Sequence, residues 1–478
     1  MRAGFCVRAS FGLFFPMRTE MDSMGVMVLP DEALYGASTQ RAVLNFPICG
    51  RPLPAGFIRG LGLVKVACAR ANEELGRLSA AKSGLIQQAA REVAEGKLTS
   101  HFPVDVFQTG SGTSTNMNAN EVIANRVSQL SGMAIGSKKP VHPNDDVNLG
   151  QSSNDIIPSA LHLSVALALA QTLRPALLHL QVALANRAGA FASVIKIGRT
   201  HLMDATPVTL GQEFSGYVRQ VEKAVERTDK AVAALRELAV GGTAVGTGIN
   251  GHPAFAGKVV RILKEETGLA FVEARDHFEA QAARDDAVEV AGHLATIAAS
   301  LTKIANDIRL LGSGPRSGLG ELRLPSTQPG SSIMPGKVNP VMCEMLVQGG
   351  IYTQGLCQMV VVCGREGQLE LNATIPLIAY ALHEAIEVLA AGARQFADAC
   401  VTGLEVDEAR CRELVARSLM LVTALNPHIG YDAAAAVAKE ALVTGKTLRE
   451  VVLAKGLMIE SVLDAALDPA RMLRPGGA

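Results

Sequence analysis

The side chains best suited to catalysis or binding lie in one short stretch, Gly330 to Glu344, which reads GSSIMPGKVNPVMCE. It combines two serines, one lysine and one asparagine with two glycines and two prolines. Glycine and proline at this density predict a loop rather than the interior of a helix or strand. Pro340 can begin a helix, because the first turn needs no donor from it. A polar loop with one cation that leads into a helix suits the binding of a small anion.

Two simpler interpretations compete with an anion site in this loop. A Walker phosphate loop needs four residues between its glycines and a Ser or Thr after its lysine. Here five residues separate Gly330 from Gly336, and Val338 follows Lys337, so the Walker interpretation fails. An ordinary surface loop is the other interpretation, because loops rich in Gly, Pro and Ser are common. The rest of the chain has to decide between them.

A second polar segment, residues 109 to 121, reads TGSGTSTNMNANE. Gly110 and Gly112 predict a tight turn, and a helix with Ile123 and Val127 on one face follows it. A turn of Ser, Thr and Gly before a helix offers free backbone N–H groups and hydroxyl donors to an anion. An ordinary helix N-cap would explain the turn alone, but it leaves the density of asparagines unexplained.

A third polar segment, residues 141 to 155, reads VHPNDDVNLGQSSND. His142 and Asp145 could suggest a metal site, but no helical His-x-x-x-His or Cys-x-x-Cys spacing supports one. A hydrogen-bonding loop is favoured instead. Ser153 and Asn154 again supply uncharged donors.

A fourth segment, residues 198 to 207, reads GRTHLMDATP and carries His201 directly after Thr200. An isolated histidine is more often structural than catalytic. This one lies between Arg199 and Asp204 in a polar loop between apolar helices. Histidine is the only side chain that titrates near neutral pH without perturbation, so His201 is a candidate for proton transfer.

A glycine pattern, GTGING at residues 246 to 251, formally matches the dinucleotide-binding fingerprint. That fingerprint requires a strand before it and a helix after it, with an acidic residue about 20 positions further on. A long predicted helix precedes the glycines here, and no βαβ pattern surrounds them. We therefore reject a Rossmann site.

The composition favours a helical, cytoplasmic protein. Of the 478 residues, 48% are hydrophobic but only 4% are aromatic, which favours an alanine-lined helical bundle over a sheet core. The 45 basic and 45 acidic side chains balance, so binding of nucleic acid has little support. Eight cysteines without a Cys-x-x-Cys pair predict reduced thiols in the cytoplasm. An uncharged run over residues 156 to 173 predicts a buried core helix rather than a membrane span.

Apolar periodicity predicts an all-α chain of three domains. Residues 22 to 54 look irregular, and the first clear helix is expected over 83 to 95, with Ser83 as its N-cap and Gly96 at its end. Residues 214 to 235 and 290 to 311 carry apolar seams with alternating steps of four and three, which predict a long central bundle shared with other subunits. The predicted organisation is an N-terminal extension of uncertain status over 1–16, a mostly helical domain over 17–151, the long-helix bundle over 152–404 and a small helical domain over 405–478.

Together the four polar loops on a helical frame resemble the aspartase/fumarase superfamily and, within it, the class II (iron-independent) fumarases, over residues 17 to 478. GSSIMPGKVNP is the superfamily signature, and TGSGT, HPNDDVN, QSSND, GRTHLMDATP and GGTAVGTGIN resemble the fumarase versions of other conserved regions. Aspartases typically have Gln in place of His201 and Ala in place of Gly336, so this chain follows the fumarase pattern at both positions. Leu149 and Ser114 depart from the residues of some fumarases.

The resemblance implies an all-α fold in which a homotetramer forms a twenty-helix core and shares its active sites between subunits. It implies reversible addition of water to fumarate, a small dicarboxylate, to give (S)-malate in the tricarboxylic acid cycle. No metal, cofactor, nucleic acid or membrane is expected. By resemblance Ser331 is the base, His201 the acid, Glu344 the carboxylate that orients His201, and Lys337 a donor to the developing charge. The expected substrate-binding residues are Ser111, Gly112, Thr113, His142, Pro143, Asn144, Asp145, Ser152, Ser153, Asn154, Thr200, Ser332, Lys337, Val338 and Asn339.

Three alternatives stay open at this point. An ammonia-lyase of the aspartase type would use ammonia rather than water as the nucleophile. A catalytically silent structural protein on the same fold is the alternative outside enzymology, and the presence of Ser331, His201, Lys337 and Glu344 together argues against it. A nucleotide-binding enzyme is a distant third.

Overall fold

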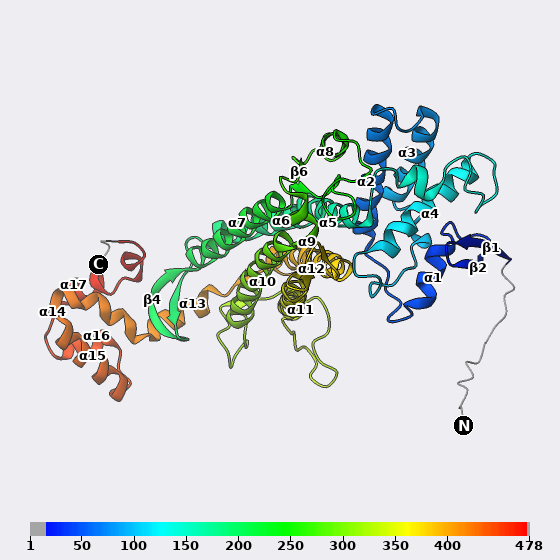
Figure 1. The fold of residues 1–478 in the computed structure, drawn as a ribbon. Helices are drawn as coiled ribbons and strands as arrows, with labels where there is room; N and C mark the ends of the chain where they lie inside the picture. The colour runs from blue at the N-terminus through cyan, green and yellow to red at the C-terminus, as the bar shows by residue number, and fades with distance from the viewer. Residues whose placement is uncertain (1–15, 476–478) are drawn as a thin grey trace, which may run out of the picture. The chain divides into compact units, whose positions relative to one another are not determined.

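The computed structural model describes residues 16–475, and these form seventeen α-helices with ten short strands that pair two by two (Figure 1). The predicted all-α class is confirmed. The N-terminal extension predicted over 1–16 lies outside the described residues, except for Pro16. The strands are β1 (Met17–Asp22), β2 (Gly25–Pro30), β3 (Ile195–Thr200), β4 (Met203–Thr209), β5 (Glu237–Leu238), β6 (Val272–Glu273), β7 (Leu322–Arg323), β8 (Gly367–Gln368), β9 (Leu371–Asn372) and β10 (Glu405–Val406).

The chain divides into two compact units, and each is assembled from separated segments. Unit 1 contains the described residues up to 172 together with 228–294 and 354–387, and unit 2 contains 173–227, 295–353 and the chain from 388 onward. The division of the chain into consecutive domains at 151 and 404 remains a prediction. The helices that contribute to both units are α7 (Leu210–Ala234), α10 (Asp285–Leu311), α11 (Val341–Gly364) and α12 (Ile375–Ala399).

Unit 1 is organised around a buried helix that the sequence analysis missed. Residues 22 to 54 were expected to be irregular, yet they contain β2 and α1, and α2 follows them. A Cβ on Gly60 or Gly62 would meet neighbouring helices at 2.6 to 2.7 Å, so these glycines allow close helix packing although they weaken the helix pattern. The helices of this unit include α1 (Ala37–Asn45), α2 (Ala55–Glu74), α3 (Ala80–Ala94), α4 (Thr113–Leu130), α5 (Ser153–Ala168), α8 (Phe255–Thr267) and α9 (His277–Ala282).

The predicted start of α3 was three residues too late. Ser79, not Ser83, is the N-cap, and its side chain accepts a hydrogen bond from the backbone N–H of Lys82. Ser83 is fully buried inside the helix and donates to the carbonyl of Ala69. A serine inside a helix and a serine at its N-cap look alike in sequence, because both lie beside helical spacing.

The predicted seam of α10 is confirmed, and that of α7 is confirmed in part. In α10 the whole predicted series from Val290 to Leu311 is buried. In α7, Phe214, Val221 and Val225 are buried, whereas Val218 and Val232 are only half-buried. Side chains spaced by four and three residues lie on one face of a helix, so a seam of this length needs a partner along its whole length.

Three helical segments of the described chain have the length and apolar composition of a membrane span: Ser153–Ala190, Val341–Gly364 and Ile375–Gly403. The first, which joins α5 to α6 (Arg174–Ala190), and the third are 78% and 67% buried within the chain over their most apolar window. Core packing therefore accounts for their hydropathy. Only 39% of the corresponding window of α11 is buried.

The C-terminal helices of unit 2 support the hairpin β3–β4 (Figure 1). Val437, Val451, Val452 and Leu463 form an apolar core with Ile197 of β3. This packing fixes one end of the hairpin against a helical cluster. The helices of the cluster are α13 (Glu408–Arg417), α14 (Asn426–Ile429), α15 (Tyr431–Thr444), α16 (Leu448–Ala454) and α17 (Glu460–Ala466).

The glycine pattern at 246–251 lies in a loop between β5 and α8, in unit 1. Contrary to the sequence expectation, β5 and β6 do pair in parallel on either side of α8. Each strand has only two residues, which is too short to present a dinucleotide site at a sheet edge. The Rossmann interpretation therefore stays rejected on this geometry.

Candidate active site

The loop Gly330–Asn339 in unit 2 is closed at its base by two hydrogen bonds. The N–H of Gly330 donates to the carbonyl of Lys337 at 3.0 Å, and the Asn339 side-chain amide donates to the carbonyl of Gly330 at 2.5 Å. A Cβ on Gly330 would lie 2.1 Å from the Lys337 oxygen, so only glycine fits there. Asn339 was predicted to bind substrate. In the structure its NH₂ group instead donates to the Gly330 carbonyl and closes the loop, so its role in binding stays a prediction.

Ser331 lies inside this loop with its hydroxyl oxygen turned toward the loop's own backbone. Its Oγ accepts hydrogen bonds from the N–H groups of Ile333, at 3.2 Å, and Met334, at 3.0 Å. Backbone donors aimed at an oxygen stabilise negative charge on it without reorganisation. The arrangement therefore lowers the cost of removing the hydroxyl proton, which is what a serine base requires.

The other predicted residues of this loop are exposed. Ser332, Lys337 and Val338 face solvent. Within the described chain the Lys337 ammonium makes no hydrogen bond or ion pair, so it is available to a substrate carboxylate. Glu344 lies in the first turn of α11, where its backbone N–H donates to the carbonyl of Pro340. Pro340 thus lies immediately before the helix, one position earlier than the predicted place in its first turn.

Thr200 and His201 lie at the tip of the hairpin β3–β4. Thr200 pairs with Met203, so His201 and Leu202 form a two-residue turn. Both have positive φ, 55° and 63°, as a type I′ turn requires. Residues other than Gly, Asn and Asp are uncommon at these two positions, because the left-handed conformation crowds their Cβ atoms. Local backbone strain of this kind is typical of functional sites.

The imidazole of His201 is exposed and makes no hydrogen bond within the described residues. Glu344, its predicted carboxylate partner, makes no contact with it in the single chain. The roles assigned to these two residues therefore stay predictions.

In unit 1, the segments 109–121 and 141–155 come together through their hydroxyl groups. The Thr113 hydroxyl bonds to that of Ser111 at 2.8 Å and to that of Ser153 at 2.7 Å. Gly112, with φ of 74°, begins α4, and any Cβ there would meet Ile157 at 2.7 Å. A row of hydroxyls at the starts of α4 and α5 can donate to a carboxylate, with both helix N-termini adding positive potential.

The start of α5 is anchored by a buried carboxylate. Ser152 and Asp155 form a capping box, and Asp155 also accepts from the N–H groups of Gly241 and Thr243, at 2.9 and 3.1 Å. Burial raises the pKa of Asp155 to about 6, and these backbone donors partly offset the rise. The neighbouring Asn154 amide donates to the carbonyl of Ala244 at 2.8 Å. The predicted loop is therefore held rigidly against residues 241–244.

His142 begins a short π-helical turn over Pro143–Val147. Its Nδ1 lies 3.2 Å from the backbone nitrogens of both Asn144 and Asp145 and 3.3 Å from the Asp145 carboxylate. Asn144 and Asp145 are exposed, and His142, Pro143 and Asn144 line a cavity of 250 Å³. His142, Pro143 and Asn144 thus lie together at a cavity that the acidic residues Glu20, Asp22 and Glu121 also line, so a second anion site there stays a prediction.

Comparisons with known proteins place the chain in a family. Residues 25–355 match a lyase family model and residues 421–474 match a model of the fumarase C C-terminus. A class II fumarate hydratase of Corynebacterium efficiens is 51% identical over 461 residues, which cover 95% of this chain and 96% of that protein. The mitochondrial fumarate hydratase of Rattus norvegicus is 50% identical, covering 96% of this chain and 90% of the rat protein. The chain belongs to the class II fumarate hydratase family.

Solved structures agree with this membership. A class II fumarase from Schistosoma mansoni matches with a TM-score of 0.94 at 41% identity, covering 96% of this chain and 100% of that one. A fumarate lyase:delta crystallin from Brucella melitensis, bound to cobalt, matches with a TM-score of 0.93 at 44% identity, with the same coverage. The resemblance to class II fumarases that the sequence motifs indicated is confirmed.

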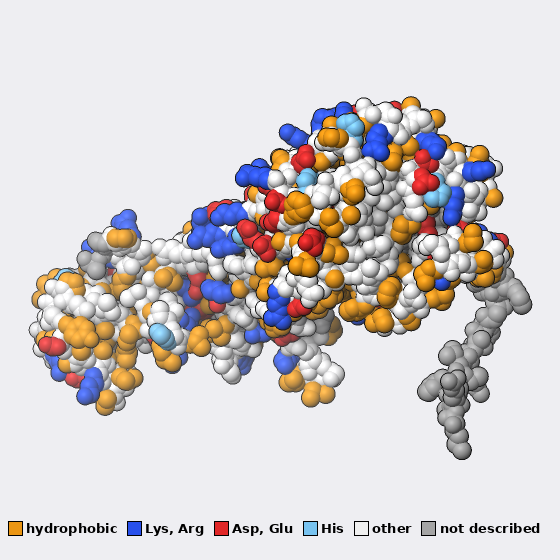
Figure 2. Space-filling view, viewed as in Figure 1, with side chains coloured by type: hydrophobic (Ala, Val, Ile, Leu, Met, Phe, Trp, Pro, Cys, Tyr) orange, Lys and Arg blue, Asp and Glu red, His pale blue; other side chains and the backbone are white. Residues whose placement is uncertain are grey.

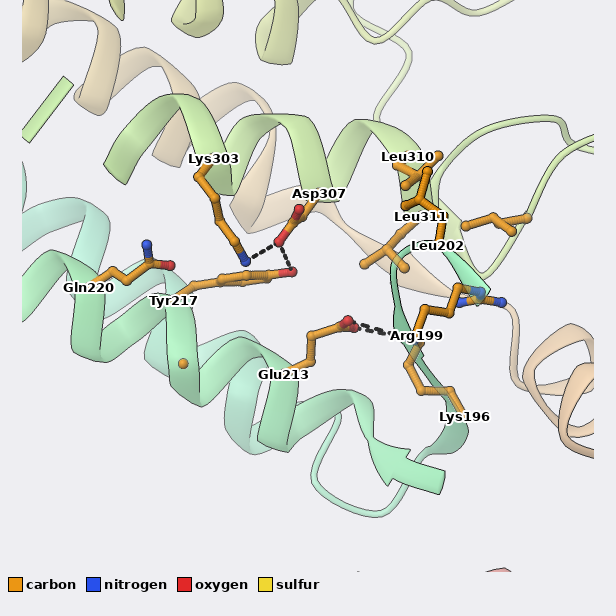
Figure 3. Close-up of a pocket in the computed structure, with 12 residues that line it drawn as sticks. Lys196, Arg199, Leu202, Glu213, Tyr217, Gln220, Lys303, Asp307, Leu310 and Leu311 are labelled. Carbon is orange, nitrogen blue, oxygen red and sulfur yellow. Dashed lines mark hydrogen bonds and ion pairs between the residues drawn. The ribbon is translucent and has the colours of Figure 1, made fainter. Parts of the chain in front are cut away.

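One polar cavity of this fumarate hydratase family member was not foreseen from the sequence. It has a volume of 520 Å³ and lies in unit 2, between the hairpin β3–β4 and the helices α7 and α10 (Figure 3). The Tyr217 hydroxyl bonds to Asp307 at 3.0 Å, and Lys303 pairs with the same carboxylate. Burial raises the pKa of Tyr217 well above its usual value. Lys196 and Arg199 of β3 also line the cavity. Two cations in a buried strand were the only sequence signal for it.

Proposed function

We propose that this protein catalyses the reversible addition of water to fumarate, giving (S)-malate. In the direction from malate, a proton must leave the carbon beside a carboxylate, which places a second negative charge on that carboxylate. The observation that carries the proposal is the Ser331 oxygen, which accepts two backbone N–H groups in a loop that also holds the unpaired Lys337. Such a loop combines a base with a donor for the charge that develops.

His201 is proposed to protonate the departing hydroxyl group. Its position at the tip of an exposed hairpin leaves both ring nitrogens open to a substrate or a neighbouring chain. Glu344 is proposed to charge and orient this imidazole from another subunit. The hydroxyl row Ser111–Thr113–Ser153 is proposed to bind a substrate carboxylate, since hydroxyls and helix N-termini suit an anion.

We propose further that the working enzyme is a homotetramer whose active sites combine residues from different subunits. The exposed apolar surface of α11 supports this arrangement: Ile351 is 63% exposed and Val361 is 40% exposed on a helix of high hydropathy. Figure 2 shows hydrophobic side chains at many points of the face it draws. A soluble chain buries such a helix against other copies of itself. Light scattering at decreasing protein concentration tests this, because an active monomer would contradict it.

A direct assay tests the reaction. Purified protein mixed with malate should produce the ultraviolet absorbance of a conjugated double bond, because fumarate has one and malate does not. Fumarate with ammonia, in place of fumarate alone, distinguishes the ammonia-lyase alternative by the appearance of an amino acid. A protein that converts neither substrate would contradict the proposed function and favour the silent structural homologue.

A further inference from the structure

A cluster of four charged side chains, of which Glu321 and Lys196 are fully buried, includes two residues of the hairpin that carries His201. The Arg199 guanidinium donates two parallel hydrogen bonds to the Glu321 carboxylate, each 2.9 Å long. Lys196 Nζ lies 3.4 Å from a Glu321 oxygen and 3.2 Å from a Glu213 oxygen. Glu321 and Lys196 have 0% and 1% of their side chains exposed, so water screens these interactions very little.

Glu321 is itself held by elements outside the hairpin. Its backbone N–H donates to the carbonyl of Leu311 at the end of α10, and its carbonyl accepts from Asp407 just before α13, both at 3.0 Å. The carboxylate is therefore a fixed point on the helical frame. Because it bonds Arg199 bidentately, it fixes the position and orientation of β3 at the residue that immediately precedes Thr200-His201.

A β-bulge lies beside the strained turn at His201. The pairing of β3 with β4 shifts register between Ile197 and Arg199, where Ala205 and Thr206 of β4 lie opposite Gly198 alone. The extra residue is therefore in β4, and a bulge increases the local twist of the hairpin. Residues 196 and 199 of one strand alternate to opposite faces. The long side chains of Lys196 and Arg199 nevertheless both reach Glu321.

We propose that Glu321 is a positioning residue for His201, acting through Arg199 and Lys196. The inference rests on the proposed hydration reaction, in which His201 transfers a proton. A turn with two residues in the left-handed conformation needs support from its surroundings to keep one geometry. Glu321 supplies that support. Stability alone explains the cluster poorly, because buried ion pairs contribute little net stability compared with apolar side chains of similar size.

The first test replaces Glu321→Gln, which keeps the shape of the side chain and removes its charge. With fumarate as substrate, kcat should fall by roughly 10- to 100-fold with KM nearly unchanged, as expected for a displaced catalytic group. Glu266→Gln is the matched control, since Glu266 accepts a similar bidentate pair from Arg91, at 2.6 and 2.8 Å, in unit 1. The control should keep its kcat.

The second test separates positioning from a general loss of structure. In a His201→Asn background, Glu321→Gln should lower kcat no further, because its effect passes through the histidine. If Glu321→Gln lowers kcat in the His201→Asn protein by the same factor as in the native protein, the proposal is overturned. In the native background the pH–rate profile of Glu321→Gln should change shape, whereas a smaller folded fraction would only scale it.

A more conservative substitution tests the same proposal if the Glu321→Gln protein does not fold. Arg199→Lys keeps the charge and loses the bidentate geometry, so it should reproduce a smaller loss of kcat with the same change in the pH–rate profile. Wild-type activity with unchanged kinetics in both variants would overturn the positioning role and leave the proposed function standing. An inactive wild-type protein would instead refute the proposed function.

Discussion

The hydroxyl oxygen of Ser331 accepts a hydrogen bond from the backbone N–H of Met334, three residues further along the same loop, at 3.0 Å. Together with the N–H of Ile333 it forms a pair of donors around one oxygen. These donors belong to the loop itself, so they remain in place wherever the loop moves. The loop therefore carries both the proposed base and the N–H groups that would stabilise its deprotonated form.

Ser331→Ala should lower kcat by about 10²- to 10⁴-fold, the usual contribution of a general base. Its circular dichroism spectrum should stay helical, because the half-buried hydroxyl contacts only its own loop. Ser215→Ala on the exposed side of α7 is the matched control and should keep full activity. Near-normal turnover of Ser331→Ala would remove this serine from the role of base.

His201→Asn should lower kcat by a similar factor, because asparagine cannot supply a proton near neutral pH. Asparagine tolerates positive φ, so the turn with φ of 55° keeps its backbone. The rate should then lose one limb of its pH dependence. Leu202→Asn, the same change one residue along, should keep the native pH–rate profile. An unchanged profile in His201→Asn would exclude this histidine from proton transfer.

Gly330→Ala should abolish activity without unfolding the chain. The new Cβ would lie 2.1 Å from the carbonyl oxygen of Lys337, so the base of the loop must open and displace Ser331. Gly84→Ala is the control: its Cβ meets nothing within 4 Å inside α3, and it should raise the free energy of unfolding by about 0.5–1 kcal/mol. Wild-type kcat in Gly330→Ala would show that the closed base of the loop is dispensable.

Acid should destabilise this protein through two buried histidines. Burial lowers the pKa of His162 and that of His383 to about 4, below the ordinary value of 6.5. The unfolded chain therefore binds more protons than the folded one between these values. The free energy of unfolding therefore has its full value above pH about 6.5, where both states of each histidine are neutral, and it decreases as the pH falls toward 4. Each histidine should cost on the order of 2 kcal/mol of unfolding free energy by pH 5.

Urea titrations from pH 7 to pH 5 measure this loss. His383→Gln keeps a group that can bond the Ser164 hydroxyl, which lies 3.0 Å from the imidazole, and removes the titration. The slope of unfolding free energy against pH should therefore decrease in this variant. His428→Gln, at an exposed position, should leave the slope unchanged. Equal slopes in His383→Gln and the native protein would contradict the assignment.

Local patterns determined the class of the fold and the chemistry of the loops. The seams of α7 and α10 were predictable, because their apolar side chains recur with the helical period along one continuous segment. The loops carrying Ser331 and the hydroxyl row were predictable for a similar reason, since Gly, Pro, Ser and Asn mark turns by their own backbone preferences. The polar loop predicted over 198–207 is instead the hairpin β3–β4, with only His201 and Leu202 in its turn. Family resemblance then supplied the roles, which spacing alone did not.

Only the tertiary structure decided the contacts between residues that are far apart in sequence. α2 escaped prediction because Gly60 and Gly62 serve close packing with neighbouring helices, which has no local signature. Arg199 and Glu321 are 122 positions apart, and their pairing depends on the place of the hairpin β3–β4 and on the fold of the segment after α10. Side chains at positions 196 and 199 of a strand alternate to opposite faces, so the sequence alone could not show that Lys196 and Arg199 meet the same carboxylate.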